Sequence, residues 1–520
     1  MSQNTKRFFR FFVIAGALTA LFYAVWLSVI SCGNPEYLKD FRSSVSPDAV
    51  TYVQLGKNIW NEGVYSRSIG EPFVPDFKWT PTFPFLAGLA DQLAGIRGIL
   101  ILNITLAFFT ALLLARIAFF WTRSRSISCL MFIFPALDPL LWSVNLQVMS
   151  DIMFLFFLIL GVYWTFPVLF PPEGLKKSEK NGSTASPEAV SSSEKNTAHE
   201  TKQAWLTYAQ SFGGGLAFSA AILTRPSGLY VPTVLTIAFF SAPLVRHFLR
   251  FFKTRKPHEA SDPKVSLKEL GVMFRRTGLL AVFLAGALGP VVGWMARNAE
   301  VFGKFALCGN QNIVMVYYSG GGAWQTALGC PLEEAQERIA QEYGLPPNVK
   351  CQNPEAFGLD QGKVDTQLAE CKRSVLFRYP KALAFSSCVG VVKSFLAHET
   401  RTLYQIAGNE KTQTDDFSIW NSWIFIWSIL FQGAILLLAF LAILRNGRSF
   451  LTFLGSDPGV GMALLGWSAY FLLTMMLSGI DCCARYRLPM MPVLYFLAAM
   501  QLAWIFTPRT GNPPASGNGN

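Results

Sequence analysis

Long apolar runs recur along the whole of this 520-residue chain, and they restrict its fold more than any other feature. The first run, 11–30, follows the basic residues Lys6, Arg7 and Arg10. A run of about 20 apolar residues is long enough to cross the hydrocarbon core as a helix. A cleaved signal peptide is the alternative for this run alone, but many more runs follow it. Further candidate spans lie at 98–120, 127–145, 148–170, 205–223, 228–246, 276–296, 421–444, 460–478 and 487–507. The sequence therefore predicts an α-helical polytopic membrane protein with about ten transmembrane helices.

The composition agrees with this class and excludes two others. Apolar residues make up 52% of the chain and charged residues only 15%, against roughly 25% charged in soluble domains. An ordinary soluble enzyme would need more polar surface, and a disordered chain would have fewer apolar residues. The segment 81–95 is apolar but too short to span, so we expect an interfacial helix there.

The net charge of +12 comes mostly from basic residues in short loops beside the apolar runs. Basic loops usually stay in the cytoplasm. This rule places the N-terminus, the loop around 246–276 and the loop around 445–448 inside, and the loops 31–80 and 297–420 outside. We therefore expect a multi-pass protein of the cell (inner or plasma) membrane, surrounded by membrane lipids. No nucleic-acid-binding motif accompanies the charge, so no nucleic-acid partner is expected.

These assignments divide the chain into four parts. An N-terminal transmembrane module, 1–296, includes the first outer loop. A mostly helical extracytoplasmic loop domain, 297–420, precedes the C-terminal transmembrane helices, 421–507, and a disordered tail, 508–520. The segment 171–203 is rich in Ser, Lys and Glu and is typical of a disordered cytoplasmic linker.

The outer loop domain contains four cysteines. In an oxidising compartment they could form two disulfides, with three pairings open. They are Cys308, Cys330, Cys351 and Cys371. The chain has no CxxC pair, so a structural zinc site is not expected.

The first outer loop contains a strong local helix signal. Ser46 suits an N-cap, Pro47 the first helical position and Gly63 the C-terminal cap, which predicts a helix over 47–62. Asp48 and Tyr52 then share one face. An ionised Asp48 could act as a general base near the membrane surface, or it could only stabilise the first turn of the helix.

Later in this loop, Lys78 stands before the Pro-rich segment TPTFPF. Its ammonium group could meet a lipid phosphate, or it could simply extend to the headgroups.

Five motifs, taken together, have the order seen in a known family. They are PDAVTY with KWTPTFPF, MSDIMFLFFLIL, GGGLAFSAAILTRPSGL, GWMARNAEVFGKFAL with NQNIVMVYYSGG, and ARYRLPMMPVLYFLAA. They extend over about 10–505, most of the chain. In this order the chain resembles the GT-C superfamily of integral-membrane glycosyltransferases, in particular the bacterial branch that contains the aminoarabinose transferases and the protein mannosyltransferase-like proteins.

The resemblance implies a GT-C-like fold and an inverting transfer of one sugar from a polyprenyl-phosphate carrier. The acceptor would be a hydroxyl of a glycan, lipid or protein on the extracytoplasmic face. By motif position, Asp48 matches the family's acidic catalytic residue and Lys78 a basic residue that contacts the carrier phosphate. The first loop lacks the Asp-Glu pair of eukaryotic protein mannosyltransferases, because Ala49 follows Asp48.

Four arginines and a tyrosine at the outer ends of spans are candidates to bind the donor phosphate. Arginine makes bidentate, charge-assisted hydrogen bonds to phosphate, although interfacial anchors of this kind are also common. The residues are Arg225, Arg297, Arg485, Tyr486 and Arg487.

Asp151 begins a span in the position where the family more often has Glu. An acid at this depth is costly and is by default a functional candidate, although it could instead have a structural place, paired with an arginine or among the lipid headgroups. A divalent metal that bridges Asp48 and Asp151 is compatible with the sequence, but no cofactor is required by it.

Two residue groups are not assigned a chemical role. His398 is expected to be a solvent-exposed loop residue, and Gly320, Gly321 and Gly322 to mark a mobile loop, because the lysine of a phosphate loop is missing.

The alternative function is a polytopic transporter or flippase of lipid-linked or small solutes. Its number of spans is suitable, but no repeat relates the two halves of the sequence. A non-enzymatic sensor or scaffold would leave the acid and the arginines without a task.

Overall fold

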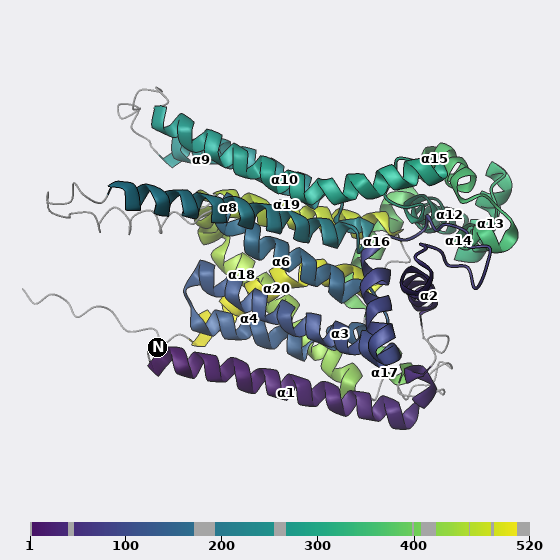
Figure 1. Cartoon of the computed structure of the whole chain (residues 1–520), viewed down its shortest axis with the longest axis horizontal. Helices are drawn as coiled ribbons and strands as arrows, with labels where there is room; N and C mark the ends of the chain where they lie inside the picture. Colours follow the sequence, from purple (N-terminus) through teal and green to yellow (C-terminus); the bar gives the residue numbers. More distant parts are fainter. Residues whose placement is uncertain are drawn as a thin grey trace, which may run out of the picture.

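The computed structural model describes residues 3–39, 46–170, 193–253, 267–397, 400–406, 423–456, 458–479 and 483–506. These residues form helices, with one isolated β-bridge between Ser66 and Pro75. Long helices run side by side in a bundle, and the short ones gather at one of its ends (Figure 1). We call that end the domain end. The opposite end, where α1 begins and Arg123 and Arg125 lie, is the basic end.

The bundle helices are α1 (Gln3–Gly33), α3 (Thr82–Thr122), α4 (Arg125–Leu137), α5 (Pro139–Asn145), α6 (Asp151–Leu169), α8 (Ser193–Ile222), α9 (Val231–Lys253), α10 (Leu267–Phe302), α18 (Trp423–Ser456), α19 (Pro458–Leu477) and α20 (Met491–Phe506). The domain end holds α2 (Pro47–Glu62), α11 (Asn310–Ile313), α12 (Gly321–Leu328), α13 (Leu332–Tyr343), α14 (Asn348–Gln352), α15 (Gln361–Phe377), α16 (Pro380–Leu396) and α17 (Thr400–Ile406). Short turns of other helix types are η1 (Pro35–Leu38), η3 (Pro226–Gly228), η5 (Val314–Gly320), η6 (Pro354–Phe357) and η9 (Ala484–Met490).

Seven of the described helices are long and apolar enough to cross a membrane, and the number rises to nine if two bent helix pairs also span. The bent pairs are α4 with α5, at 58°, and α15 with α16, at 96°. The predicted class, an all-helical polytopic membrane protein, is confirmed. The expected number of about ten spans is too high for the described helices by this criterion, because α8 is less apolar and the apolar part of α9 is short.

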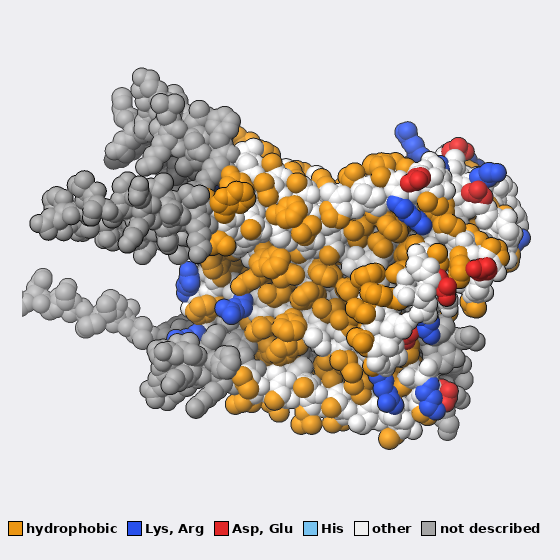
Figure 2. Space-filling model, in the orientation of Figure 1, with side chains coloured by type: hydrophobic (Ala, Val, Ile, Leu, Met, Phe, Trp, Pro, Cys, Tyr) orange, Lys and Arg blue, Asp and Glu red, His pale blue; other side chains and the backbone are white. Residues whose placement is uncertain are grey.

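Hydrophobic side chains cover the middle of the bundle, and charged side chains gather towards its two ends (Figure 2). On α1 the residues Val13, Ile14, Leu18 and Leu21 are all more than half exposed. Exposed apolar residues in this number would be unfavourable in water but suit contact with lipid.

Glycines explain why the polar helix α8 lies inside the bundle. A Cβ added at Gly215 would stand 2.2 Å from the carbonyl oxygen of Phe283 in α10, and one at Gly214 would stand 2.3 Å from Oγ1 of Thr165 in α6. Small residues allow such close backbone approach, which is how membrane helices associate without a hydrophobic driving force. The GGG motif of the sequence is therefore a packing surface.

The helix α3 is bent near its start, at Ala94 and Gly95, and Gly95 has a φ of 62°. The segment before the bend contains the interfacial helix that the sequence predicts for 81–95. It packs against α2 through Gly56 and Gly88, since a Cβ on Gly56 would lie 2.7 Å from Cα of Gly88. This contact joins the first loop firmly to the bundle.

The loop domain has its own core, built around Tyr317, Trp324, Leu368 and Val375. The preceding helix α10 continues to Phe302, past the predicted domain boundary at 297.

The prediction of a mobile loop at Gly320, Gly321 and Gly322 is wrong. These glycines lie where η5, a π-helix, passes into α12, and all three are buried. A Cβ on Gly320 would stand 2.6 Å from the side chain of Val375. Close helix packing, rather than flexibility, accounts for glycine here.

The four loop-domain cysteines are free in the structure, so the two disulfides expected from the sequence are not formed. Cys308 and Cys351 are buried, and burial raises the pKa of Cys308 to about 12 and that of Cys351 to about 11. Both are thiols at neutral pH, and Cys351 donates to the carbonyl of Pro346.

Several predictions fall outside the described residues. They concern His398, the tail 508–520 and the linker as far as 192. The last part of the predicted linker, from Ser193, is helical and belongs to α8.

Candidate functional site

A buried carboxylate between two arginines lies at the domain end of the bundle. Asp151 begins α6, and its side chain is 2% exposed. Its Oδ1 is paired with Arg225, and its Oδ2 lies 3.7 Å from Nη1 of Arg485. The N-terminus of α6 adds favourable amide groups for the negative charge. We call Asp151, Arg225 and Arg485 the Asp151 cluster.

The two arginines come from distant parts of the chain. Arg225 is the N-cap of η3, in the turn between α8 and α9, and Pro226 follows it in the first helical position. Arg485 lies in η9, directly before α20. Their side chains are 23% and 25% exposed, so each guanidinium group is reached from outside the protein while Asp151 is not.

Tyr52 connects this cluster to the first loop. It lies on α2, is buried, and packs edge-on against the rings of Trp79 and Phe83, each with its centroid 4.9 Å away. Burial raises the pKa of Tyr52 well above its usual value, and the charge of Asp48 adds to this effect. The hydroxyl is therefore protonated at neutral pH, and it lies within hydrogen-bonding reach of Ser150.

Asp48 stands one turn before Tyr52 on α2, and its side chain is partly exposed. The predicted helix over 47–62, with Ser46 as N-cap and Gly63 as C-cap, is confirmed. Neither Asp48 oxygen is held by an ion pair among the described residues. The charges of Asp48 and Asp151 add to the rise in the pKa of Tyr52, and the charge of Arg225 opposes it.

Lys78 lies on the same loop but faces the loop domain. Its Nζ donates to the carbonyl of Gln352 at 3.2 Å and lies 4.8 Å from the centroid of the Trp79 ring. Trp79 in turn contacts Tyr52, so Lys78 is connected to the site only through Trp79. The prediction from the sequence was that Lys78 contacts the donor phosphate directly.

Arg297 is surrounded by aromatic rings. Its guanidinium lies 5.6 Å from the ring of Tyr65, 5.0 Å from that of Trp294 and 5.3 Å from that of Phe302. It also donates to the main-chain carbonyl of Asp76 at 3.1 Å. These contacts fasten the first loop to α10.

Arg487 is two residues from Arg485 but is 2% exposed. It donates to the carbonyls of Ser394 and Ala397, each at 2.6 Å, and to Oε1 of Gln432 at 2.9 Å. These carbonyls end α16, where positive charge is favourable. Tyr486, between the two arginines, is half-buried and packs against the cluster of apolar residues around α6 and α19.

Sequence reasoning missed two buried acids. Asp76 pairs with Arg67 and accepts from the main-chain nitrogen of Trp79 at 3.0 Å, which shapes the loop before Lys78. Asp138 caps α5 by accepting from the nitrogen of Leu140 at 2.9 Å, and it also accepts from Tyr495. For Asp138 a signal was available, because an acid directly before Pro139 is a common helix start.

Among the described residues, no group of three or more His, Cys, Asp or Glu side chains could hold a metal ion. Both oxygens of Asp151 face guanidinium groups, so a metal bridge between Asp48 and Asp151 does not fit this arrangement.

Comparison with known proteins gives two distant structural likenesses. No family model matches the chain, and no curated protein does. The archaeal oligosaccharyltransferase AglB from Archaeoglobus fulgidus, in complex with an inhibitory peptide and a dolichol-phosphate, aligns with a TM-score of 0.43 at 14% identity over 97% of this chain and 51% of AglB. ArnT from Cupriavidus metallidurans, bound to undecaprenyl phosphate, aligns with a TM-score of 0.35 at 14% identity over 89% of this chain and 77% of ArnT. The chain thus spans about half the length of AglB.

Proposed function

We propose that this chain is an integral-membrane glycosyltransferase. It transfers one sugar from a polyprenyl-phosphate carrier to a hydroxyl group of a glycan, lipid or protein, with inversion, on the extracytoplasmic face. The domain end of the bundle then faces outwards, as the basic loops of the sequence predict. The motif resemblance to GT-C glycosyltransferases supplies the reaction class.

One observation supports the proposal most strongly. Asp48 lies one turn from Tyr52 on α2, and Asp151, which is distant in the sequence, joins Asp48 in raising the pKa of Tyr52. Inverting glycosyl transfer needs a base at the acceptor hydroxyl and a cationic group at the leaving phosphate. We assign the base to Asp48 and the cationic group to Arg225 and Arg485.

The proposed reaction is one displacement at the anomeric carbon. The acceptor oxygen forms a bond to this carbon while the bond from the carbon to the phosphate oxygen breaks. Asp48 takes the proton of the acceptor hydroxyl, which raises the nucleophilicity of the oxygen as it attacks. The polyprenyl phosphate leaves with the electron pair, and its negative charge is stabilised by the two guanidinium groups.

In this mechanism Asp151 is a positioning residue. It holds Arg225 and Arg485 from behind, so that their remaining N–H groups point away from the buried carboxylate. Arginines that are fixed before the donor arrives lose less side-chain entropy on binding. Tyr52, protonated at neutral pH, supports the wall of the site between Asp48 and Asp151.

The geometry narrows the set of phosphate-binding residues that the sequence predicts. Arg487 and Arg297 already donate to main-chain carbonyls, and a phosphate would have to displace these bonds. Lys78 is bound to the loop domain. We therefore assign the phosphate to Arg225 and Arg485, with Tyr486 beside them, and give Lys78 and Arg297 the role of holding the first loop.

Replacement of the base tests the proposal. In Asp48→Asn we expect sugar transfer to fall by about 10²- to 10⁴-fold, the usual contribution of a general base. Glu62→Gln, at the exposed end of the same helix, is the matched control and should keep full activity. The readout is mass spectrometry of surface lipids and glycans in cells that carry each variant. Full transfer by a normally folded Asp48→Asn protein would exclude Asp48 as the base.

Donor binding is tested separately with undecaprenyl phosphate and the purified full chain. Arg485→Gln and Arg225→Gln should each weaken its binding by about tenfold or more, since each removes a charge-assisted contact. Asp48→Asn should bind it as the unchanged protein does. If none of the three variants alters binding, the phosphate lies elsewhere. Movement of a solute that does not depend on the carrier would favour the transporter.

A further inference from the structure

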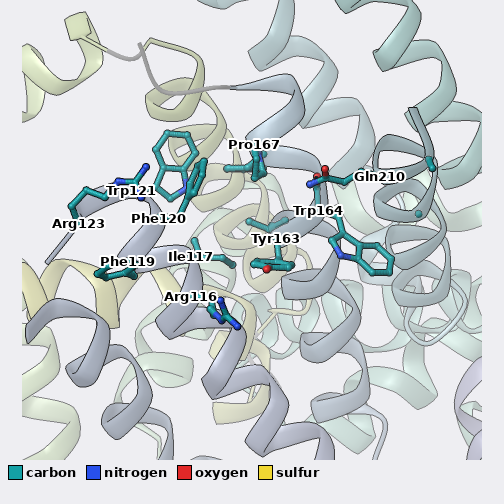
Figure 3. A pocket seen from close by; sticks show the side chains of 14 residues that line it. Arg116, Ile117, Phe119, Phe120, Trp121, Arg123, Tyr163, Trp164, Pro167 and Gln210 are labelled. Atoms are coloured by element: carbon teal, nitrogen blue, oxygen red, sulfur yellow. The ribbon is translucent and has the colours of Figure 1, made fainter. Parts of the chain in front are cut away.

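The basic end of the bundle contains a second cationic site, which the proposed function does not use. A cavity of about 530 Å³ opens there between the ends of α3 and α6 and the middle of α8. Its size is within the range of ligand-binding pockets. Arg123, Phe120 and Trp121 lie at one side of it, and Trp164 and Gln210 at the other (Figure 3). We call it the basic-end pocket.

The lining of this pocket combines apolar walls with positive charge. Among the described residues that line it are Arg116 and Arg123 but neither Asp nor Glu. Neither arginine has an ion-pair partner among the described residues. This differs from the Asp151 cluster, where a carboxylate lies between the arginines. A matching ligand has an apolar part for the aromatic walls and an anionic group for the two guanidinium groups.

The depth of the pocket indicates where that ligand comes from. Arg116 is six residues before the last residue of α3, Thr122, which places it about 9 Å along the helix axis. On α6 the lining residues, among them Tyr163 and Trp164, belong to its last two turns. Tyr and Trp are the residues that mark the interface of a membrane. The pocket therefore lies at the level of lipid phosphates and the upper acyl chains.

The backbone at Arg123 supports a binding role. Arg123 ends α3 with a φ of 54°, the one non-glycine residue with positive φ among those described. Glycine is the usual residue in this left-handed cap, and another residue costs about 1 kcal/mol. With this backbone the guanidinium lies 5.5 Å from the ring centroid of Phe120, at the pocket wall. An arginine in place of a less strained glycine suggests that its charge is needed there.

We propose that the basic-end pocket binds an anionic glycerophospholipid of the surrounding membrane. The lipid phosphate contacts Arg116 and Arg123, and its acyl chains lie along the aromatic walls formed by α3 and α6. This site is independent of the proposed glycosyl transfer. It joins α3, α6 and α8 at the end of the bundle that is farther from the Asp151 cluster.

The test is native mass spectrometry of the purified full chain with phosphatidylglycerol or phosphatidylcholine. We expect phosphatidylglycerol to bind more tightly. In Arg116→Gln with Arg123→Gln this binding should fall by about tenfold or more, since two charge-assisted contacts are lost. Arg125→Gln, an exposed arginine of the same loop outside the pocket, is the control and should change it by less than about twofold. Equal binding of the two lipids, or full binding by the double variant, overturns the proposal.

A second variant separates binding from folding. Arg123→Gly removes the guanidinium and at the same time relieves the left-handed backbone, so it should be at least as heat-stable as the unchanged protein while it binds phosphatidylglycerol more weakly. Undecaprenyl phosphate serves as a competitor in the same titration. If it displaces phosphatidylglycerol at far lower concentration, the site belongs to the carrier lipid and the phospholipid assignment is wrong.

Discussion

The arginines at the two ends of the bundle have different surroundings. At the domain end, Arg225 and Arg485 are held by the buried carboxylate of Asp151. At the basic end, Arg116 and Arg123 line an open pocket, and no acid is among its described lining residues. A carboxylate fixes the direction of a guanidinium before any ligand arrives, whereas arginines without one bind through charge and adapt their side chains. The difference separates a site built for one geometry from a site that selects its lipid by charge.

The largest effect is expected from removal of the acid at the domain end. Asp151→Asn removes the buried carboxylate that pairs with Arg225 and lies beside Arg485, and loss of one partner of a buried ion pair costs about 3 kcal/mol. Thermal unfolding in detergent should show this loss, and sugar transfer should fall to background. Arg116→Gln at the basic end should change the free energy of unfolding by less than about 0.5 kcal/mol. Similar stability losses at both ends would remove the contrast.

Arg485 and Arg487 sharpen the comparison within one motif. Arg487→Gln should destabilise the protein by about 2 kcal/mol, because the buried carbonyls of Ser394 and Ala397 lose their donor. Arg485→Gln removes one of the two arginines beside Asp151, so it should cost less stability than Arg487→Gln but lose affinity for undecaprenyl phosphate. The two measurements are thermal unfolding and lipid binding on each variant. If Arg487→Gln lost lipid binding and Arg485→Gln lost stability, the roles assigned to the two arginines would have to be exchanged.

We expect salt to have a smaller effect on lipid binding, and this effect should differ between the two ends. Between about 0.05 and 0.5 M NaCl we expect roughly a fivefold loss of phosphatidylglycerol binding at the basic-end pocket, since its arginines are exposed and screened. Binding of undecaprenyl phosphate to the half-buried arginines of the Asp151 cluster should change less. Titrations of each lipid at both salt concentrations give the ratio.

A buried acid without an arginine extends the comparison. Asp365, in the loop domain, accepts from Nδ2 of Asn312 at 2.7 Å, and burial raises its pKa above the usual range. The folded state then holds the proton more tightly than the unfolded state, so stability should fall as the pH rises from the ordinary Asp value through the raised one. Asp365→Asn should remove this part of the pH dependence. Glu333→Gln, exposed in the same domain, should not alter the slope of stability against pH.

Local signals allowed the first loop to be predicted from the sequence, whereas long-range partners were not accessible. The helix over 47–62 depends on Ser46, Pro47 and Gly63, which act within one turn, so its bounds agree with α2. The pairing of Asp151 with an arginine was one of two open alternatives, because Arg225 is 74 residues away and only packing brings it close.

Errors arose where one residue type has several uses. Glycine permits loops, but it also permits close helix contact, and the second use applies at Gly320 to Gly322. Arg485 and Arg487 both flank Tyr486, and the carbonyls at the end of α16 accept from Arg487, which is the buried one. The basic-end pocket gave no sequence signal, since Arg116 is a single charge inside a long apolar run.

The contact between Gly56 and Gly88 limits how the acceptor substrate can approach. With almost no space between the two backbones, α2 and the first part of α3 form one rigid unit. Asp48, on this unit, cannot move towards an incoming hydroxyl, so the acceptor itself has to move towards Asp48. Under the proposed function, a long or mobile acceptor would be glycosylated more readily than a rigid one of the same chemistry.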